Sequence, residues 1–500
     1  MKNVFRLCLL FIGITVQISA QTSYFDVNES NAYKDQHKTT NILSIYTTPQ
    51  NLTIVARKSK STLIFESFDE NAKGKKIKSI PLSKKESFVG EFYYDNQVRV
   101  FMVESPSKTK RILNCYTLNI STFTSTKATL LDTNVEKKSA LFSGQNKRQT
   151  NFSISPNKKF IAITTDNVKK NSNSYDVHLF DAKTLSPVFT KAYYANEEKY
   201  YTSSDMVVDN NGVVFSIGKE YFKGRRERKK AKANYSYVLT KIDNDNIATG
   251  KIELTEDEYI KSMSLSFYKD NLRLIGYYSQ DKVFGIKGVS QFSVDKNTLS
   301  VLNKKKAPLP NKVFEDLYGY RNAKSKKDSE LTSFNLDYIL EDEKGNTFLI
   351  AEEFYVVQVY VSNGMNGGYY VTTYHYDDIL ITKLDANGNL KWGRSIFKRA
   401  TEPSYNAFLK NDKLYILLNS GKKLSDKSDG RLKVSKGWFE STSLYAFVYD
   451  IDGNLDYEKI QDNKGKTTYI PYLGSYNNGK FVMYNHSKGR KQIMMLKCKQ

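Results

Sequence analysis

Two pairs of carboxylates beside an aromatic stretch are the strongest candidates for chemistry in this chain. Glu352-Glu353 and Asp377-Asp378 lie on either side of that stretch, which also contains His375. Two carboxyl groups about 5–10 Å apart can act together in the cleavage of a glycosidic bond. Spacing along a sequence does not show separation in space, so a glycan hydrolase or lyase is one hypothesis and enzymatic activity stays open.

Other patterns of metal and nucleophile chemistry are missing from the sequence. The four histidines have no His, Cys or acidic partner at metal-ligand spacing. The stretch 450–456 has glycine at its fourth position, as a hairpin turn requires, whereas an EF-hand calcium loop needs it at the sixth. No G-x-S-x-G motif is present. We therefore assign no catalytic residue, no metal site and no cofactor, and we expect His178 to be packed within a strand.

Segments that combine basic groups with aromatic rings are the candidate binding sites. Arginine and lysine pair with sulfate, carboxylate or phosphate groups, and aromatic rings stack on sugars. Residues 220–234 and 420–442 are rich in lysine and arginine, and 354–377 is typical of a projecting aromatic hairpin. The predicted binding residues are Arg225, Arg226, Arg228, Tyr369, Tyr370, Tyr374, His375, Trp438 and Phe439. The alternative interpretation is that these charged runs are solvated loops.

Repeated strands must position these residues. Eight alternating apolar segments, most of them followed by a turn, end near Asp69, Asn119, Asp181, Asp243, Asp295, Asp385, Asp450 and Cys498. Short turns rich in Asn, Asp and Gly separate the strands of each unit, and helical periodicity is almost absent. This pattern predicts an all-β fold, a single β-propeller of four-stranded antiparallel blades.

The number of blades follows from the number of units. Eight blades are predicted, and seven blades or two separate β domains are the alternatives. The last unit lacks a strand, and an open sheet edge is unfavourable. We therefore expect the segment near Ser23–Asn28 to pair with the last blade and close the ring.

Long connections are expected on one face of the propeller. The connections 166–174, 220–234, 354–377 and 420–442 join second to third strands, and 133–149 and 303–333 join consecutive blades. In an antiparallel blade these two classes of connection lie at the same end. Because loops tolerate length and carry binding residues, this face is the predicted functional surface.

The start of the chain and its charge bear on location and partners. Residues 1–20 have a basic start, a short apolar core and a small-residue cleavage site, which predict a signal peptide, so 21–500 is the propeller domain. No later stretch is long enough to span a membrane. The net charge of +23 favours an acidic glycan, lipopolysaccharide or an envelope protein as partner. Export disfavours nucleic acid.

The hairpin sequences ILITKLDANGNLKW, FVYDIDGNLDY and VVDNNGVVFSIG resemble the repeats of exported bacterial β-propeller proteins of the Bacteroidota type. The resemblance covers most of the mature chain and implies the propeller fold and a periplasmic or extracellular location. The sequence therefore favours a non-catalytic binding or scaffold propeller that recognises an anionic or glycan partner through its long-loop face. Whether Cys115 and Cys498 pair is not determined by their spacing.

Overall fold

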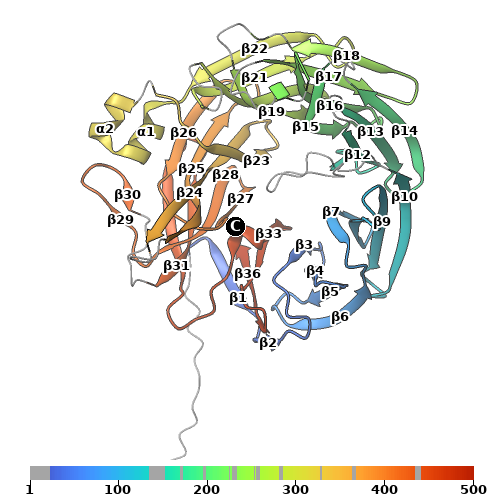
Figure 1. The fold of residues 1–500 in the computed structure, drawn as a ribbon. Coiled ribbons are helices and arrows are strands. Elements are labelled where there is room, and N and C mark those ends of the chain that lie inside the picture. The colour runs from blue at the N-terminus through green and yellow to red at the C-terminus, as the bar shows by residue number, and fades with distance from the viewer. Residues whose placement is uncertain are drawn as a thin grey trace, which may run out of the picture.

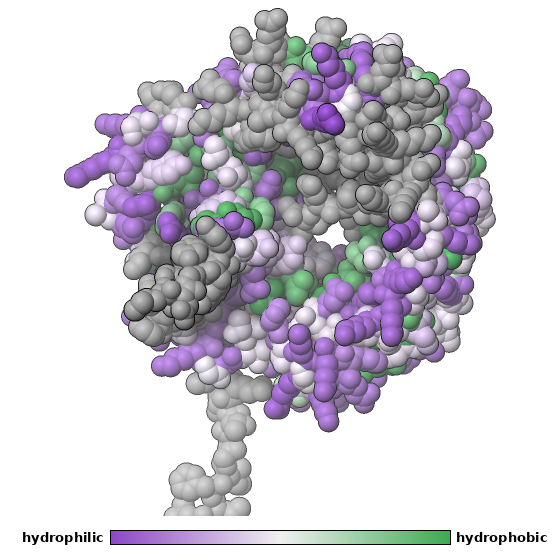
Figure 2. Space-filling view, viewed as in Figure 1, coloured by the Kyte–Doolittle hydropathy of each residue, from purple (hydrophilic) through white to green (hydrophobic). Residues whose placement is uncertain are grey.

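Eight four-stranded antiparallel sheets follow one another around a ring and form a β-propeller (Figure 1). The computed structural model describes residues 23–134, 152–168, 173–194, 199–224, 226–227, 234–252, 254, 259–280, 285–326, 329–362, 368–433 and 441–499. An opening is visible near the centre of the ring (Figure 2). The predicted fold class and the count of eight blades are therefore confirmed.

The first strand of each blade lies nearest the centre of the ring, and the fourth lies at the rim (Figure 1). The strands of blades 1 to 4 are β3 (Ile42–Thr47), β4 (Thr53–Lys58), β5 (Thr62–Phe68) and β6 (Gly74–Pro81); β7 (Glu86–Tyr94), β8 (Gln97–Glu104), β9 (Lys110–Asn119) and β10 (Ser125–Asn134); β11 (Phe152–Ile154), β12 (Phe160–Val168), β13 (Asn173–Asp181) and β14 (Pro187–Tyr194); and β15 (Tyr200–Val208), β16 (Val214–Tyr221), β17 (Tyr235–Ile242) and β18 (Ile247–Ile252).

Blades 5 to 7 follow the same order, and blade 7 has a small additional hairpin between its second and third strands. Their strands are β19 (Tyr259–Tyr268), β20 (Asn271–Ser279), β21 (Gly288–Val294) and β22 (Val301–Pro308); β23 (Phe334–Glu341), β24 (Thr347–Ser362), β25 (Gly368–Leu384) and β26 (Leu390–Ile396); and β27 (Tyr405–Lys410), β28 (Lys413–Gly421), β31 (Thr442–Tyr449) and β32 (Leu455–Asp462). The additional hairpin is β29 (Ser425–Asp426) and β30 (Leu432–Lys433).

The two ends of the described chain meet in blade 8. This blade contains β33 (Ser475–Asn477), β34 (Lys480–Tyr484) and β36 (Ile493–Cys498), and its outer strand is β1 (Phe25–Glu29). The pairing of β1 with β36 runs from Phe25↔Cys498 to Glu29↔Met494. A smaller pair, β2 (Tyr33–Lys34) with β35 (Arg490–Lys491), lies beside it, and a 3-10 helix at Pro471–Leu473 precedes β33. The predicted closure by the N-terminal segment is confirmed.

The core lies between adjacent blades, which explains the near-continuous apolar runs in their middle strands. A strand that is covered on both faces has no polar side. In β8 six consecutive residues, 98–103, are buried, and in β34 all five are. Outer strands have a different pattern, because one edge and much of their surface are exposed: every residue of β6 is exposed except Ile80.

Local turn chemistry closes the hairpins. In the turn after β25, the carboxylate of Asp385 accepts hydrogen bonds from the backbone amides of Asn387 and Asn389, and Gly388 has φ of +83°. The same arrangement recurs after β31, where Asp450 accepts from Asn454 and Gly453 has φ of +82°. These stretches are therefore hairpin turns, as their sequence predicts.

The stretch 303–333 differs from its prediction as a long loop. Residues 303–308 belong to β22, so the lysines at 304–306 lie on an outer strand. Two helices follow, α1 (Asn311–Tyr318) and α2 (Tyr320–Lys326). Val313, Phe314 and Leu317 of α1 are buried in a cluster shared with blades 5 and 6. The helix forms because these apolar residues recur at helical spacing over one short segment, a local signal within a sequence dominated by strands.

Candidate functional site

The connection from blade 5 to blade 6 and an additional hairpin of blade 7 meet at the rim of the ring, where Figure 1 shows α1, α2 and the β29–β30 hairpin. The backbone amide of Tyr320, at the start of α2, donates to the carbonyl of Asp429 in the hairpin, at 2.9 Å. The glycines at 319 and 430 permit this close approach, because a Cβ at Gly430 would lie 2.2 Å from the Tyr320 ring. We call α1–α2, residues 394–399 and the β29–β30 hairpin the blade 6–7 junction.

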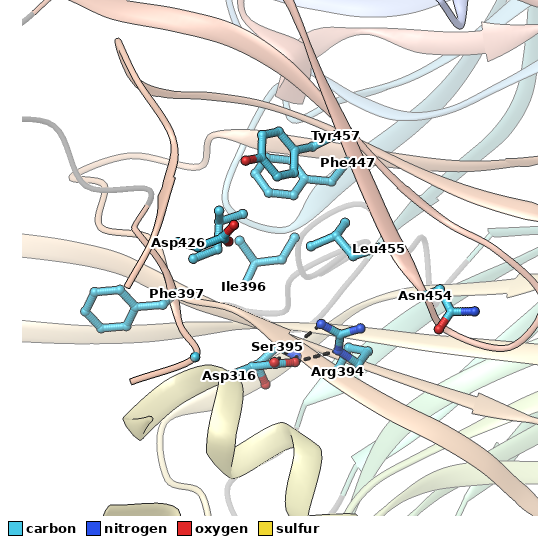
Figure 3. A pocket seen from close by; sticks show the side chains of 12 residues that line it. Asp316, Arg394, Ser395, Ile396, Phe397, Asp426, Phe447, Asn454, Leu455 and Tyr457 are labelled. Atoms are coloured by element: carbon cyan, nitrogen blue, oxygen red, sulfur yellow. Dashed lines mark hydrogen bonds and ion pairs between the residues drawn. The ribbon is translucent and has the colours of Figure 1, made fainter. Parts of the chain in front are cut away.

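The blade 6–7 junction encloses a pocket of about 380 Å³ (Figure 3). Small-molecule sites in proteins have volumes of about 300–1,000 Å³ and combine apolar walls with a few polar groups. The pocket is lined by Asp316, Arg394, Ser395, Ile396, Phe397, Asp426, Gly430, Leu432, Phe447, Asn454, Leu455 and Tyr457. Its walls therefore include three aromatic rings, and its polar groups come from four different elements or turns.

An ion pair forms one side of this pocket, as the dashed lines in Figure 3 show. Arg394 Nε donates to Asp316 Oδ2 at 2.7 Å, and Arg394 Nη1 donates to the carbonyl of Gly453 at 2.7 Å. Lys312 Nζ lies 3.0 Å from Asp316 Oδ1. Arg394 thus joins β26 to α1 and to the β31–β32 turn, and it holds the walls of the pocket in place.

The pocket also has a cationic border. The guanidinium carbons of Arg399 and Arg431 lie 5.5 and 5.6 Å from the centroid of the Phe397 ring, within the range of cation–π contacts. Arg431 is bonded to Asp429 at 2.6 Å, whereas Arg399 is exposed. An anionic substituent on a ligand that contacts Phe397 would therefore meet the charge of Arg399.

Beside this border, both predicted carboxylate pairs come together at a β-bulge. The register of β24 and β25 shifts between Glu352 and Phe354, opposite Asp377 and Asp378. Glu352 pairs with Lys398 at 2.7 Å, and Tyr355 donates to Asp377 at 2.7 Å. The structure thus joins residues 24 to 26 positions apart in sequence into one carboxylate cluster.

Crowding in this cluster changes proton affinities. Burial, then the charges of Glu353 and Asp377, raises the pKa of Asp378 to about 8. Burial and the charge of Asp377 also raise the pKa of Glu353. The hydrogen bond to Asp377, together with burial, raises the pKa of Tyr355 to about 12. A carboxyl with a strongly raised pKa is a candidate functional group, because it can carry a proton near neutral pH.

The predicted binding residues do not all lie in one place in the structure. Tyr374 and His375 lie in β25, and the His375 ring stacks on Tyr355 with centroids 4.7 Å apart. Tyr369 and Tyr370 lie further along β25, where only the backbone is described. Arg226 is exposed between β16 and β17 in blade 4, so it belongs to a different blade from Tyr374 and His375. Arg225, Arg228, Trp438 and Phe439 lie outside the described residues.

Sequence reasoning missed the pocket itself. Asp316, Arg394, Asn454 and Tyr457 lie in a helix, a strand, a turn and a second strand, whose sequence patterns are structural. The only signal was an arginine within an apolar strand, in the stretch 390–396, and that signal does not identify a partner.

Two other sequence questions have structural answers. His178 is buried between the hydroxyl groups of Thr165 and Thr190, at 3.1 and 3.0 Å, so it is packed as predicted. Cys115 and Cys498 are free and buried.

Within the described ranges, no group of three His, Cys, Asp or Glu side chains is arranged to hold a metal ion. In the same part of the chain, no helix has the length and apolar character needed to cross a membrane.

Comparison with known proteins finds only distant similarities among the solved structures. No protein-family model matches the sequence, and no curated protein does. Similar solved structures include a prolyl endopeptidase (9% identity, TM-score 0.36, covering 83% of this chain and 55% of that one). The WD40 domain of SCAP from fission yeast is 9% identical, with a TM-score of 0.40 and 94% of both chains covered. An oligogalacturonate lyase from Vibrio parahaemolyticus is 9% identical, with a TM-score of 0.39, covering 91% of this chain and 98% of that one.

These similarities are too distant to support an argument about activity. The chain also spans only about 55% of the length of the prolyl endopeptidase that it matches.

Proposed function

We propose that this protein is an exported binding propeller that recognises a glycan through the pocket of the blade 6–7 junction. The observation that carries the proposal is the lining of that 380 Å³ pocket, which combines aromatic rings with carboxylate, amide and guanidinium groups. Sugars present both C–H faces, which pack on aromatic rings, and hydroxyl groups, which exchange hydrogen bonds with such polar groups.

Charge favours an acidic glycan over a neutral one. Arg399 is exposed beside Phe397, and the whole chain carries a net charge of +23. A field of this sign raises the local concentration of anionic ligands. A uronic acid or a sulfated sugar could place its ring on Phe397 and its anionic group at Arg399. Acidic polysaccharides and the sugar part of lipopolysaccharide share this chemistry.

A glycan array with the full mature chain tests the proposal. The array should include neutral, uronate-containing and sulfated oligosaccharides, together with lipopolysaccharide, at low ionic strength. We expect binding of an acidic glycan, and Phe397→Ala and Tyr457→Ala should weaken it at least tenfold. Phe222→Ala is the matched control, because Phe222 is an exposed aromatic residue of blade 4. Unchanged binding in both pocket variants, or no bound glycan, would contradict the proposal.

Glycan cleavage is the second candidate function, and the raised pKa of Asp378 beside Asp377 is the observation that favours it. A carboxyl that stays protonated near neutral pH can act as a general acid. Glycans that bind should therefore be incubated with the protein and examined for new chain ends. Cleavage that is lost in Asp378→Asn would support this function. If the glycans stay intact, the cleavage hypothesis is contradicted and only the binding function remains.

A further inference from the structure

The β24–β25 hairpin extends beyond its own blade as a two-stranded arm, which in the described part of the chain comprises residues 354–362 and 368–376. This arm contains no Asp, Glu, Lys or Arg, although 26% of the whole chain is charged. β23 pairs with β24 only as far as Glu353, and β26 pairs with β25 only as far as Ile379. Beyond these points the two strands of the arm pair with each other, up to Ser362↔Gly368.

Both edges of the arm are open. The last hydrogen bonds on the outer sides are donated by two amides. The amide of Phe354 donates to the carbonyl of Ser333 at 2.8 Å, and the amide of Tyr376 donates to the carbonyl of Ala400 at 2.9 Å. Because amide direction alternates along a strand, the amides of residues 356, 358, 372 and 374 also point outward. Among the described residues, no backbone carbonyl accepts from these four amides.

The arm lacks the protection that other exposed edges of this protein have. Natural sheets protect open edges with charged side chains, lysine in particular. Outer strand β6 carries lysines at 75, 76 and 78, and β22 carries them at 304, 305 and 306. Figure 2 shows hydrophilic residues along the rim around blades 1 and 2. An edge without such lysines is suited to pairing with another strand.

The arm also exposes apolar surface next to these open edges. Val356 is 47% exposed and Tyr374 is 52% exposed, and the two residues are directly opposite each other in the register. The rings of Phe354 and Tyr374 are stacked, with centroids 6.5 Å apart. A third strand on either edge would extend this apolar face and bury part of it.

We propose that the arm binds an extended segment of a different protein, which adds to it as a third β-strand. Main-chain hydrogen bonds supply affinity in this mode, and alternate side chains supply specificity. The carboxylates of Glu353 and Asp377 at the base of the arm favour a segment with a basic residue at one end. A second copy of the arm is a poor occupant, because the arm contains no lysine or arginine to place beside these carboxylates. The proposal is independent of glycan binding, since it uses a different surface.

Synthetic peptides provide the probe for this proposal. The first is an eight-residue peptide of alternating valine and tyrosine that ends in two lysines. The second ends in two glutamates, and the third is the lysine peptide with alternate backbone amides methylated. Fluorescence anisotropy with the full mature chain would measure binding, and hydrogen–deuterium exchange of fragments covering 368–378 would locate it. Thr372→Pro removes an outward amide at an edge position that tolerates proline, and Thr372→Val is its matched control.

We expect the lysine peptide to bind at least tenfold more tightly than the other two and to slow exchange in the arm. Thr372→Pro or the equivalent change Gln358→Pro on the other edge should abolish that binding, whereas Thr372→Val should retain it. Equal affinity for all three peptides, no slowed exchange, or full binding by both proline variants would overturn the proposal. A stable dimer of the chain in which exchange of the arm is slowed would show that a second copy is the occupant and would overturn it as well.

Discussion

Arg57 and Asp35 form an ion pair in which Arg57 Nη1 lies 2.8 Å from Asp35 Oδ2, although both side chains are only 1% exposed. Arg57 is on β4 of blade 1, and Asp35 follows β2 in the N-terminal segment. Arg57 Nη2 also pairs with Glu66 of β5 at 2.7 Å, and Glu66 accepts from Tyr484 of blade 8 at 2.8 Å. These contacts join the N-terminal segment to the first and last blades, where the ring closes.

Removing Arg57 should destabilise the protein strongly. Breaking a buried ion pair leaves a charge without compensation and costs about 3–5 kcal/mol. We therefore expect Arg57→Met to lower the free energy of unfolding by about that amount, measured by urea denaturation. Lys110→Ala is the control, because the Lys110–Asp132 pair, at 3.1 Å, is exposed and should contribute less than about 1 kcal/mol. Equal effects in the two variants would show that Arg57 does not hold the closure.

The same ion pair should make stability depend on pH in the acid range. Burial acts to raise the pKa of Asp35, but the hydrogen bonds and charge of Arg57 outweigh it, so the pKa lies below its usual value. The stabilisation is complete above the unfolded pKa of about 3.9 and is lost as pH falls through the folded pKa. The difference in unfolding free energy between the protein and Asp35→Asn should stay constant from pH 6 to 7 and shrink below about pH 4. A constant difference down to pH 2 would contradict this account.

Asp378 should have the opposite effect on stability. Burial, with the charges of Glu353 and Asp377, raises its pKa to about 8, so the folded state binds a proton that the unfolded state has released. Stability contributed by this group is therefore present below about pH 4 and declines as pH rises towards 8. Asp378→Asn should become more stable than the unchanged protein over that range, measured by thermal unfolding at each pH.

Asp181→Asn is the control for this measurement. Hydrogen bonds from Thr184 lower the pKa of Asp181, so its effect should not change between pH 5 and 8. For each variant, the melting temperature is compared with that of the unchanged protein at each pH. If these differences change with pH in the same way for Asp378→Asn and Asp181→Asn, the carboxylate cluster does not set the pH dependence of stability.

Gly453 should tolerate alanine less well than Gly465. Both have positive φ, +82° and +71°, which costs a residue with a Cβ about 1–2 kcal/mol. A Cβ at Gly453 would also lie 2.7 Å from Trp392 of blade 6, whereas a Cβ at Gly465 would have no heavy atom within 4 Å. Gly453→Ala should therefore lower the melting temperature more than Gly465→Ala does. Equal melting temperatures would indicate that the contact between this turn and Trp392 adjusts without loss.

Much of the fold could be predicted because its signals are local. Asp385 and Gly388 form their turn with residues that are at most four positions away. Strands in the middle of a blade have continuous runs of apolar residues, whereas strands nearer its edge alternate between polar and apolar residues. The stretch 354–377 was predicted as a projecting hairpin for the same reason, and β24 and β25 pair there. The helices at 311–326 were not predicted, because a short helical pattern between two strands is a weak signal.

The sequence by itself predicted antiparallel four-stranded blades and favoured eight of them, because each turn and each strand depends on neighbours along the chain. Only the tertiary structure decided which side chains from different blades and connections meet. Asp316 and Arg394 are 78 positions apart, and Glu66 of blade 1 and Tyr484 of blade 8 are 418 apart. Such contacts depend on the twist and packing angle of neighbouring blades, which no local pattern encodes.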